Sequence, residues 1–163
     1  MSKTEKTVMD MILWRHAEAR DAAEGESDLT RPLTPRGEKQ AQRMAEWLNR
    51  FLPESTRILV SPARRTLQTA DALGRKYRTM EALAPGAGVP QVLAAARWPD
   101  SREPVLVVGH QPTLGLLAAY LMSGSMPEQA WTIRKGAVWW LRHRLREAVP
   151  EVVLVSVRTP EKL

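Results

Sequence analysis

The chain of 163 residues contains no cysteine. That absence excludes disulfide bonds, thiolate metal sites and catalysis by a cysteine nucleophile, and it fits the cytoplasm, where we expect the protein to act. No stretch approaches the roughly 18 apolar residues of a membrane span, so we expect no membrane partner. Residues 1–7 carry charges with no apolar segment behind them, which predicts a flexible tail rather than a secretory signal. The length then predicts a single domain over residues 8–163.

Several chemical motifs are also missing. The chain has no phosphate-binding Gly-x-x-x-x-Gly-Lys-Ser/Thr run, no Gly-x-Gly-x-x-Gly after a strand and no Gly-x-Ser-x-Gly elbow. No histidine or carboxylate cluster has the spacing of metal ligands. We therefore expect no cofactor and no metal. Aromatic residues make up 6% and are not interleaved with basic ones, and no DNA-binding motif is visible, so we expect no nucleic-acid partner.

The net charge of +6 comes from 24 Lys and Arg against 18 Asp and Glu. A basic solvated surface explains it most simply, and an anionic partner is the alternative. Basic residues are dense late in the chain, at Arg134, Lys135, Arg142, Arg144 and Arg146.

Alternating strand and helix patterns predict the fold. Apolar strand segments at residues 8–14, 57–60 and 105–109 are each followed by a helix pattern. The helices are expected to open at Thr34-Pro35, at Ser61-Pro62 (running to about residue 76) and at Gln111-Pro112, with a shorter helix at 89–97. Segments 137–142 and 151–157 predict an antiparallel hairpin with a turn around 146–150. Together they predict an α/β fold: a three-layer α/β/α sandwich with a mostly parallel central sheet and a C-terminal antiparallel hairpin.

Polar residues follow all three parallel strands. Arg15 and His16 end the first, Ser61 with Arg64 and Arg65 follows the second, and His110 ends the third. Right-handed crossovers place these junctions on one edge of the sheet, where ligands bind in such folds. Arginine forks and helix N-termini suit a phosphate dianion, and imidazole can attack or move a proton near neutral pH. Arg64 and Arg65 are adjacent and only one can point into the site. Spacing leaves the choice almost even, and we place Arg64 there.

The chain resembles the histidine phosphatase superfamily, which includes the cofactor-dependent phosphoglycerate mutases. Residues 13–19, around Arg15-His16, are similar to its Arg-His-Gly signature, with Ala17 in place of Gly. Residues 61–70 and 108–112 match its second and third motifs, and 28–37 match the segment after the first. Within the superfamily the chain looks most like the short phosphohistidine phosphatases of the SixA type.

The resemblance implies a phosphoglycerate mutase-like fold and roles for five residues. His16 is the expected nucleophile, forming a phosphohistidine intermediate. Arg15 and Arg64 are expected to hold the phosphoryl oxygens, with His110 as a donor in its imidazolium form and Arg31 as a further phosphate contact. The general acid stays open between Glu18, Glu81 and none, because the segment between the second and third motifs is short.

The resemblance favours a metal-independent phosphatase acting on phosphohistidine of a phosphotransfer or signalling protein. A general small-molecule phosphomonoesterase of the same superfamily is the alternative, and a non-catalytic phosphate-binding module is a third hypothesis. We expect the phosphorylated substrate to be the main partner of the protein, and we expect the protein itself to be a monomer or a weak dimer.

Overall fold

The computed structural model describes residues 8–162 of the chain. The predicted tail, residues 1–7, and the last residue of the predicted domain, Leu163, lie outside the described residues. No helix in the described range is long and apolar enough to cross a membrane.

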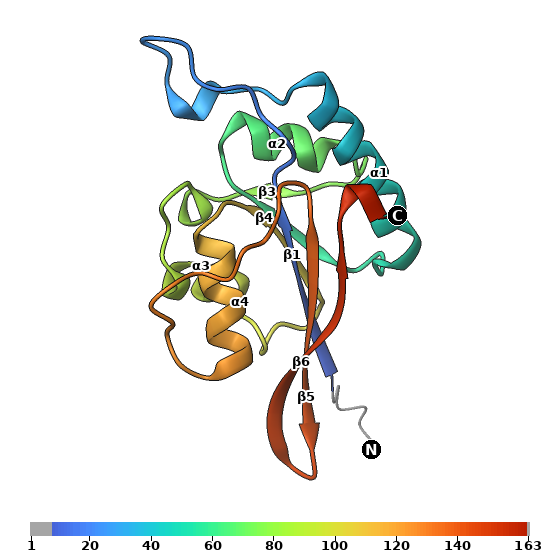
Figure 1. Cartoon of the computed structure of the whole chain (residues 1–163). Coiled ribbons are helices and arrows are strands. Elements are labelled where there is room, and N and C mark those ends of the chain that lie inside the picture. Colours follow the sequence, from blue (N-terminus) through green and yellow to red (C-terminus); the bar gives the residue numbers. More distant parts are fainter. Residues whose placement is uncertain (1–7, 163) are drawn as a thin grey trace.

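A six-stranded mixed sheet forms the centre of the structure, in the order β3-β2-β4-β1-β5-β6 (Figure 1). The strands are β1 (Val8–Arg15), β2 (Arg57–Val60), β3 (Arg78–Thr79), β4 (Val105–Gly109), β5 (Val138–Arg146) and β6 (Val149–Arg158). The first four are mutually parallel, and β5 runs antiparallel to both β1 and β6. The predicted sheet is confirmed, including its C-terminal antiparallel pair. The two-residue edge strand β3 was not predicted, since such a short exposed segment has no apolar pattern.

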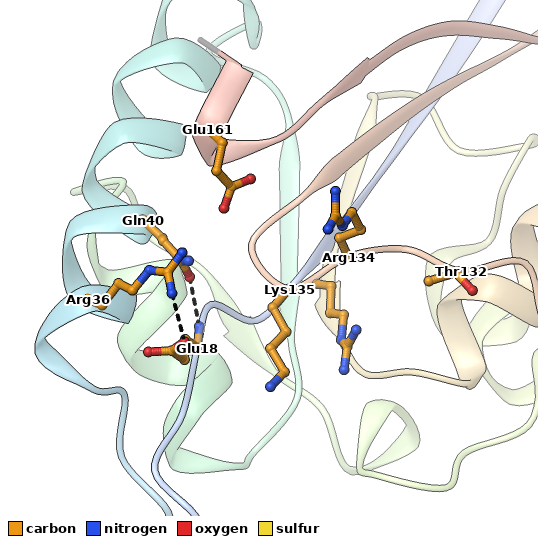
Figure 2. Close-up of a pocket in the computed structure, with 8 residues that line it drawn as sticks. Glu18, Arg36, Gln40, Thr132, Arg134, Lys135 and Glu161 are labelled. Atoms are coloured by element: carbon orange, nitrogen blue, oxygen red, sulfur yellow. Dashed lines mark hydrogen bonds and ion pairs between the residues drawn. The ribbon is translucent and has the colours of Figure 1, made fainter.

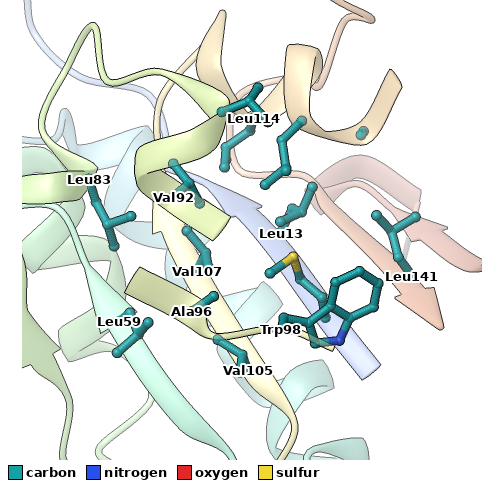
Figure 3. Close-up of a cluster of buried hydrophobic side chains, with 14 of the residues drawn as sticks. Leu13, Leu59, Leu83, Val92, Ala96, Trp98, Val105, Val107, Leu114 and Leu141 are labelled. Atoms are coloured by element: carbon teal, nitrogen blue, oxygen red, sulfur yellow. The ribbon is translucent and has the colours of Figure 1, made fainter. Parts of the chain in front are cut away.

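Helices cover both faces of the sheet, as the sandwich prediction requires. They are α1 (Pro35–Phe51), α2 (Arg64–Asp71), α3 (Val89–Ala96) and α4 (Thr113–Ser123), with short 3-10 turns η1 (Asp28–Thr30), η2 (Glu81–Leu83) and η3 (Pro160–Lys162). One apolar cluster joins α1 and α2 to Ile12 and Trp14 of β1. The other joins α3 and α4 to Met11 and Leu13 of the same strand (Figure 3). Alternate residues of a strand point to opposite faces, so residues 11–14 of β1 are all apolar because both faces of the strand are buried there.

The C-terminal hairpin is longer and tighter than predicted. Its strands continue to Arg146 and restart at Val149, so the turn consists of Glu147 and Ala148, both with positive φ (51° and 67°). Two positive φ values are the geometry of the tight turn that matches strand twist. The charged residues before the turn were interpreted as a loop, but Arg144 pairs with Glu151 across the two strands. Cross-strand ion pairing therefore explains the extra length.

Helix α1 begins where the sequence predicts and lies against the segment that follows β1. The Thr34 side chain accepts a hydrogen bond from the Gly37 amide (2.9 Å), and Pro35 is the first helical residue. A Cβ on Gly37 would lie 2.0 Å from the Glu18 carbonyl oxygen. Glycine at this position is therefore what lets the helix approach the chain beside His16.

Candidate active site

The three strand-to-helix junctions lie level with one another at one edge of the sheet. Arg15 is opposite Gly109 in the register of β1 and β4, and the His16 amide donates to the Gly109 carbonyl (3.1 Å). The Ser61 amide donates to the Val108 carbonyl (3.1 Å) in the same way. These bonds between neighbouring strand ends bring together residues 45 or more positions apart in the chain.

His16 is buried, with 6% of its surface exposed, and its ring is fixed by the adjacent backbone. Its Nδ1 lies 2.7 Å from the Ala17 carbonyl oxygen. A carbonyl only accepts, so Nδ1 carries the proton and the lone pair lies on Nε2. The pKa of His16 is lowered to about 3, chiefly by burial and also by nearby His110, Arg65 and Arg15, which together outweigh the raising effect of the Ala17 hydrogen bond. The imidazole is thus neutral at neutral pH and has an available lone pair.

His110 is also buried (3% exposed), and its ring centroid lies 5.4 Å from that of His16. Its Nε2 lies 2.7 Å from the hydroxyl of Ser61, and its Nδ1 lies 3.4 Å from Nη2 of Arg65. Burial, followed by the Arg65 charge, lowers the pKa of His110 to about 4. The expectation of an imidazolium is therefore wrong for the ligand-free site, because a cation here would be desolvated beside a guanidinium.

Arg65, and not Arg64, is the arginine that α2 supplies to this site, so our choice of Arg64 is corrected. Helix α2 begins at Arg64, and its buried side carries Arg65, Thr66, Thr69 and Ala70. Arg64 lies on the exposed side of the helix. The prediction erred because the helix starts two residues later than Ser61-Pro62 suggests, which changes the face that each arginine occupies.

Arg65 is held in place by the loop that follows β1. Its Nη1 donates to the Asp28 carbonyl (2.8 Å) and its Nη2 to the Asp28 carboxylate (3.0 Å). Although partial burial raises the pKa of Asp28, hydrogen bonds and charge from Arg65 and Arg31 outweigh that effect and lower it. Asp28 therefore stays ionised and fixes two guanidinium groups at once.

Arg15 and Arg31 supply the other two guanidinium groups of the site. The Arg15 Nη1 donates to the Ile133 carbonyl (2.9 Å), while its buried Nε has no partner among the described residues. Arg31 donates from Nε to Asp28 (2.9 Å) and from Nη1 to the Arg20 carbonyl (3.0 Å). A pocket of about 200 Å³ is lined by Arg15, His16, Ala19, Asp21, Arg31, Arg65, Pro85, His110, Gln111 and Lys135. We call it the histidine pocket.

Neither carboxylate considered as general acid lines the histidine pocket. Glu18 accepts a hydrogen bond from the Thr34 hydroxyl (2.7 Å) beside α1, and Glu81 is exposed in η2. The carboxylate that does line the pocket is Asp21, which sequence reasoning missed because it lies in a loop without a motif. Ser61 and Asp28, which fix His110 and Arg65, were also unassigned, although both belong to the matched motif segments. Within residues 8–162, no three His, Asp or Glu side chains are grouped as metal ligands would be.

The chain matches the family model of the histidine phosphatase superfamily (branch 1) over residues 11–85. It is 34% identical over 127 residues to phosphohistidine phosphatase SixA of Escherichia coli K12, covering 73% of this chain and 78% of that protein. The chain therefore belongs to the histidine phosphatase superfamily, and these similarities assign it to the hydrolases.

Among solved structures, the chain is similar to the protein histidine phosphatase SixA complexed with tungstate. The TM-score is 0.71 at 29% identity, over 93% of this chain and 97% of the other. The structure of mycobacterial glucosyl-3-phosphoglycerate phosphatase, 20% identical with a TM-score of 0.64 over 90% of this chain and 97% of the other, shares the fold. The predicted SixA-type resemblance and mutase-like architecture are thus confirmed.

Proposed function

We propose that the protein is a phosphatase that forms a phosphohistidine intermediate on His16 and removes phosphoryl groups from phosphohistidine of a phosphotransfer or signalling protein. One observation carries this proposal. His16, whose Nε2 makes no hydrogen bond to any residue in the described range, lines a pocket together with three arginines and His110. A neutral, oriented nucleophile surrounded by cations is the arrangement that phosphoryl transfer needs.

The first half-reaction uses the fixed tautomer of His16. Its Nε2 lone pair attacks phosphorus while the bond from phosphorus to the substrate nitrogen breaks. The substrate imidazole, which already carries a proton on its other ring nitrogen, leaves as a neutral ring. Arg15, Arg31 and Arg65 hold the equatorial oxygens, where the charge lies in the transition state. In the second half-reaction water attacks the phosphoenzyme, releases inorganic phosphate and restores neutral His16. The Ala17 carbonyl stabilises the positive charge that develops on the ring, since it accepts a hydrogen bond from Nδ1–H throughout.

His110 serves as a hydrogen-bond donor to the same oxygens. The Arg65 guanidinium can only donate to Nδ1, so in the free site the proton of the neutral ring lies on Nε2, which donates to the Ser61 hydroxyl. A bound dianion would favour protonation of the ring, since it supplies the opposite charge that the free site lacks. Protonation adds an N–H on Nδ1, which can donate to the dianion. The similar SixA structure contains tungstate, a tetrahedral oxyanion, and we infer that phosphate occupies the histidine pocket here.

Two features favour phosphohistidine over a phosphate ester. A protonated imidazole leaves without help, so the reaction does not need a strong general acid at the pocket. Of the segment that joins α2 to β4, Pro85 is the residue that lines the pocket. That segment therefore covers little of the site, which leaves room for a side chain presented by another protein. A cytoplasmic location is part of the same proposal.

Single-turnover mixing tests the proposal. The protein is mixed with a phosphohistidine-bearing phosphotransfer protein, and separately with an aryl phosphate, at neutral pH with a chelator present. Fast loss of phosphoryl groups from the protein substrate and slow cleavage of the aryl phosphate are expected. The opposite preference would identify the alternative, a small-molecule phosphomonoesterase, for which the shared fold of the glucosyl-3-phosphoglycerate phosphatase is the supporting observation. Binding of the phosphoprotein without turnover of either substrate would leave the non-catalytic module.

A further inference from the structure

A second cavity, of about 310 Å³ and shown in Figure 2, shares two lining residues with the histidine pocket. We call it the side cavity. Its lining consists of Arg15, Glu18, Arg36, Gln40, Thr132, Arg134, Lys135 and Glu161. Arg15 and Lys135 line both cavities, so a ligand bound at His16 can extend from one to the other.

Positive charge in the side cavity exceeds negative charge. Four cations line it against two carboxylates, Glu18 and Glu161. Glu18 already accepts the Thr34 hydroxyl, and its contact with Arg36 is long (3.7 Å). The side chains of Arg134 and Lys135 make no ion pair or hydrogen bond within residues 8–162. Arg36 lies in the first turn of α1, where the helix dipole disfavours a cation unless an anion is near.

The loop that supplies Arg134 and Lys135 is held rigidly to the nucleophile. The Arg15 guanidinium donates to the Ile133 carbonyl, and the Trp14 indole donates to the Gly136 carbonyl (3.1 Å). The Gly136 amide in turn donates to the His16 carbonyl (2.9 Å). These bonds flank Arg134 and Lys135 on both sides, so the backbone positions of the two cations are fixed relative to His16.

We propose that the side cavity binds a carboxylate side chain located next to the phosphorylated histidine of the substrate protein. This inference rests on the proposed function and adds to it a preference for acidic neighbours of phosphohistidine. The planar forks of Arg36 and Arg134 match the geometry of a carboxylate. A carboxylate is the anion that an unmodified protein side chain supplies, so it is the ligand expected beside the phosphohistidine.

The test compares two phosphohistidine peptides that differ at one flanking position, Glu in one and Gln in the other. The wild-type protein should prefer the Glu peptide about tenfold in kcat/KM, mainly through KM. Arg134→Ala should reduce this preference to about twofold, and Arg134→Glu should transfer it to a third peptide with Lys at that position. Arg146→Ala is the matched control and should keep the tenfold preference, because Arg146 ends β5 whereas Arg134 and Lys135 precede the start of that strand.

Failure of this inference is distinguishable from failure of the proposed function. Equal kcat/KM on the Glu and Gln peptides, with both turned over, would refute the carboxylate subsite and leave the phosphohistidine phosphatase standing. Turnover of an aryl phosphate without turnover of any peptide would refute the proposed function. In that case binding of the same peptides to His16→Ala still decides the subsite: tighter binding of the Glu peptide supports it and equal binding overturns it. Stronger competition by a small bisphosphate than by the Glu peptide would also overturn it.

Discussion

The end of β1 and the end of β4 each deliver one buried histidine, but the two rings are held by different kinds of partner. His16 faces a carbonyl oxygen, which accepts only and therefore fixes one tautomer. His110 faces the hydroxyl of Ser61, which can donate or accept, and the guanidinium of Arg65. Two neighbouring imidazoles with similarly lowered pKa values can therefore have different chemical roles. His16 retains a free lone pair on Nε2, whereas the protonation of His110 depends on the bound ligand.

The largest expected effect separates the two histidines. His16→Ala should abolish turnover and the phosphoenzyme, with a loss of at least about 10⁴-fold in kcat, as for other nucleophiles. His110→Ala should lose about 10²- to 10³-fold yet still form a phosphoenzyme, because it removes a stabilising donor only. Rapid-quench kinetics with radiolabelled substrate measures both. A phosphoenzyme in the His16 variant, or none in the His110 variant, would reverse the assignment.

The adjacent arginines of α2 provide the next comparison. Arg65→Ala should reduce kcat/KM by about 10²- to 10³-fold, since it removes a charged donor from the pocket and leaves Asp28 with Arg31 as its remaining ion-pair partner. Arg64→Ala is the matched control and should stay within about threefold of wild type, as is usual for exposed residues. Steady-state kinetics with circular dichroism to verify folding would check this. A larger loss in the Arg64 variant would contradict the positions of the two side chains.

Ser61→Ala tests whether the hydroxyl prepares His110. The hydroxyl contacts no substrate in this account, so the variant should lose about tenfold in kcat through poorer orientation of the ring. The acid limb of its pH profile should also change, because a packing defect alone would not alter the protonation of His110. An unchanged profile combined with a lowered Tm would assign Ser61 a purely structural role.

Acid should destabilise the ligand-free protein through both histidines. Their folded pKa values, about 3 and about 4, are below the ordinary 6.5, so the unfolded chain binds protons first as the pH falls. Stability from the neutral rings is therefore present above pH 6.5 and is lost between about 6.5 and 4 for His110 and between about 6.5 and 3 for His16. We expect Tm to fall by at least about 5 °C over this range, and by less with inorganic phosphate bound or in His110→Asn. Equal slopes in all three samples would refute the assigned pKa shifts.

The smallest expected effect concerns the carboxylate that lines the pocket. Asp21→Asn should change phosphohistidine turnover by less than about threefold, because the protonated imidazole leaves without a general acid. The same variant should reduce cleavage of an alkyl phosphate ester more strongly, since an alkoxide needs a proton. Parallel assays on the two substrates measure the ratio. An equal large loss on both would make Asp21 a required acid.

Sequence reasoning predicted the parts of this structure that depend on periodicity and on topology. Strands that are apolar on both faces gave the parallel sheet, and right-handed crossovers brought residues 15–16, 61–66 and 110 to one edge. The prediction was wrong where the side of a helix had to be assigned to one of two adjacent residues. Arg64 and Arg65 differ only in the face they occupy, and that face depends on Ala63, not Ser61, being the N-cap of α2.

Long-range contacts account for the other differences. Asp28 binds Arg65, which lies 37 positions later in the sequence, and no local sequence pattern predicts that hydrogen bond. The histidine pKa values depend on burial, which the chain acquires only on folding. The long C-terminal hairpin depends on the cross-strand pairing of Arg144 with Glu151, where the sequence shows a run of charges typical of a turn.

The most direct test of the central claim is to locate the phosphoryl group on the trapped enzyme. The reaction is quenched in base, which preserves phosphohistidine, and the bond is assigned by ³¹P and ¹H NMR together with peptide mass spectrometry. The account predicts phosphate on Nε2 of His16, since Nδ1 is occupied by its proton and the Ala17 carbonyl. Phosphate on Nδ1 of His16 or on any other residue, or rapid turnover with no phosphoenzyme, would contradict it.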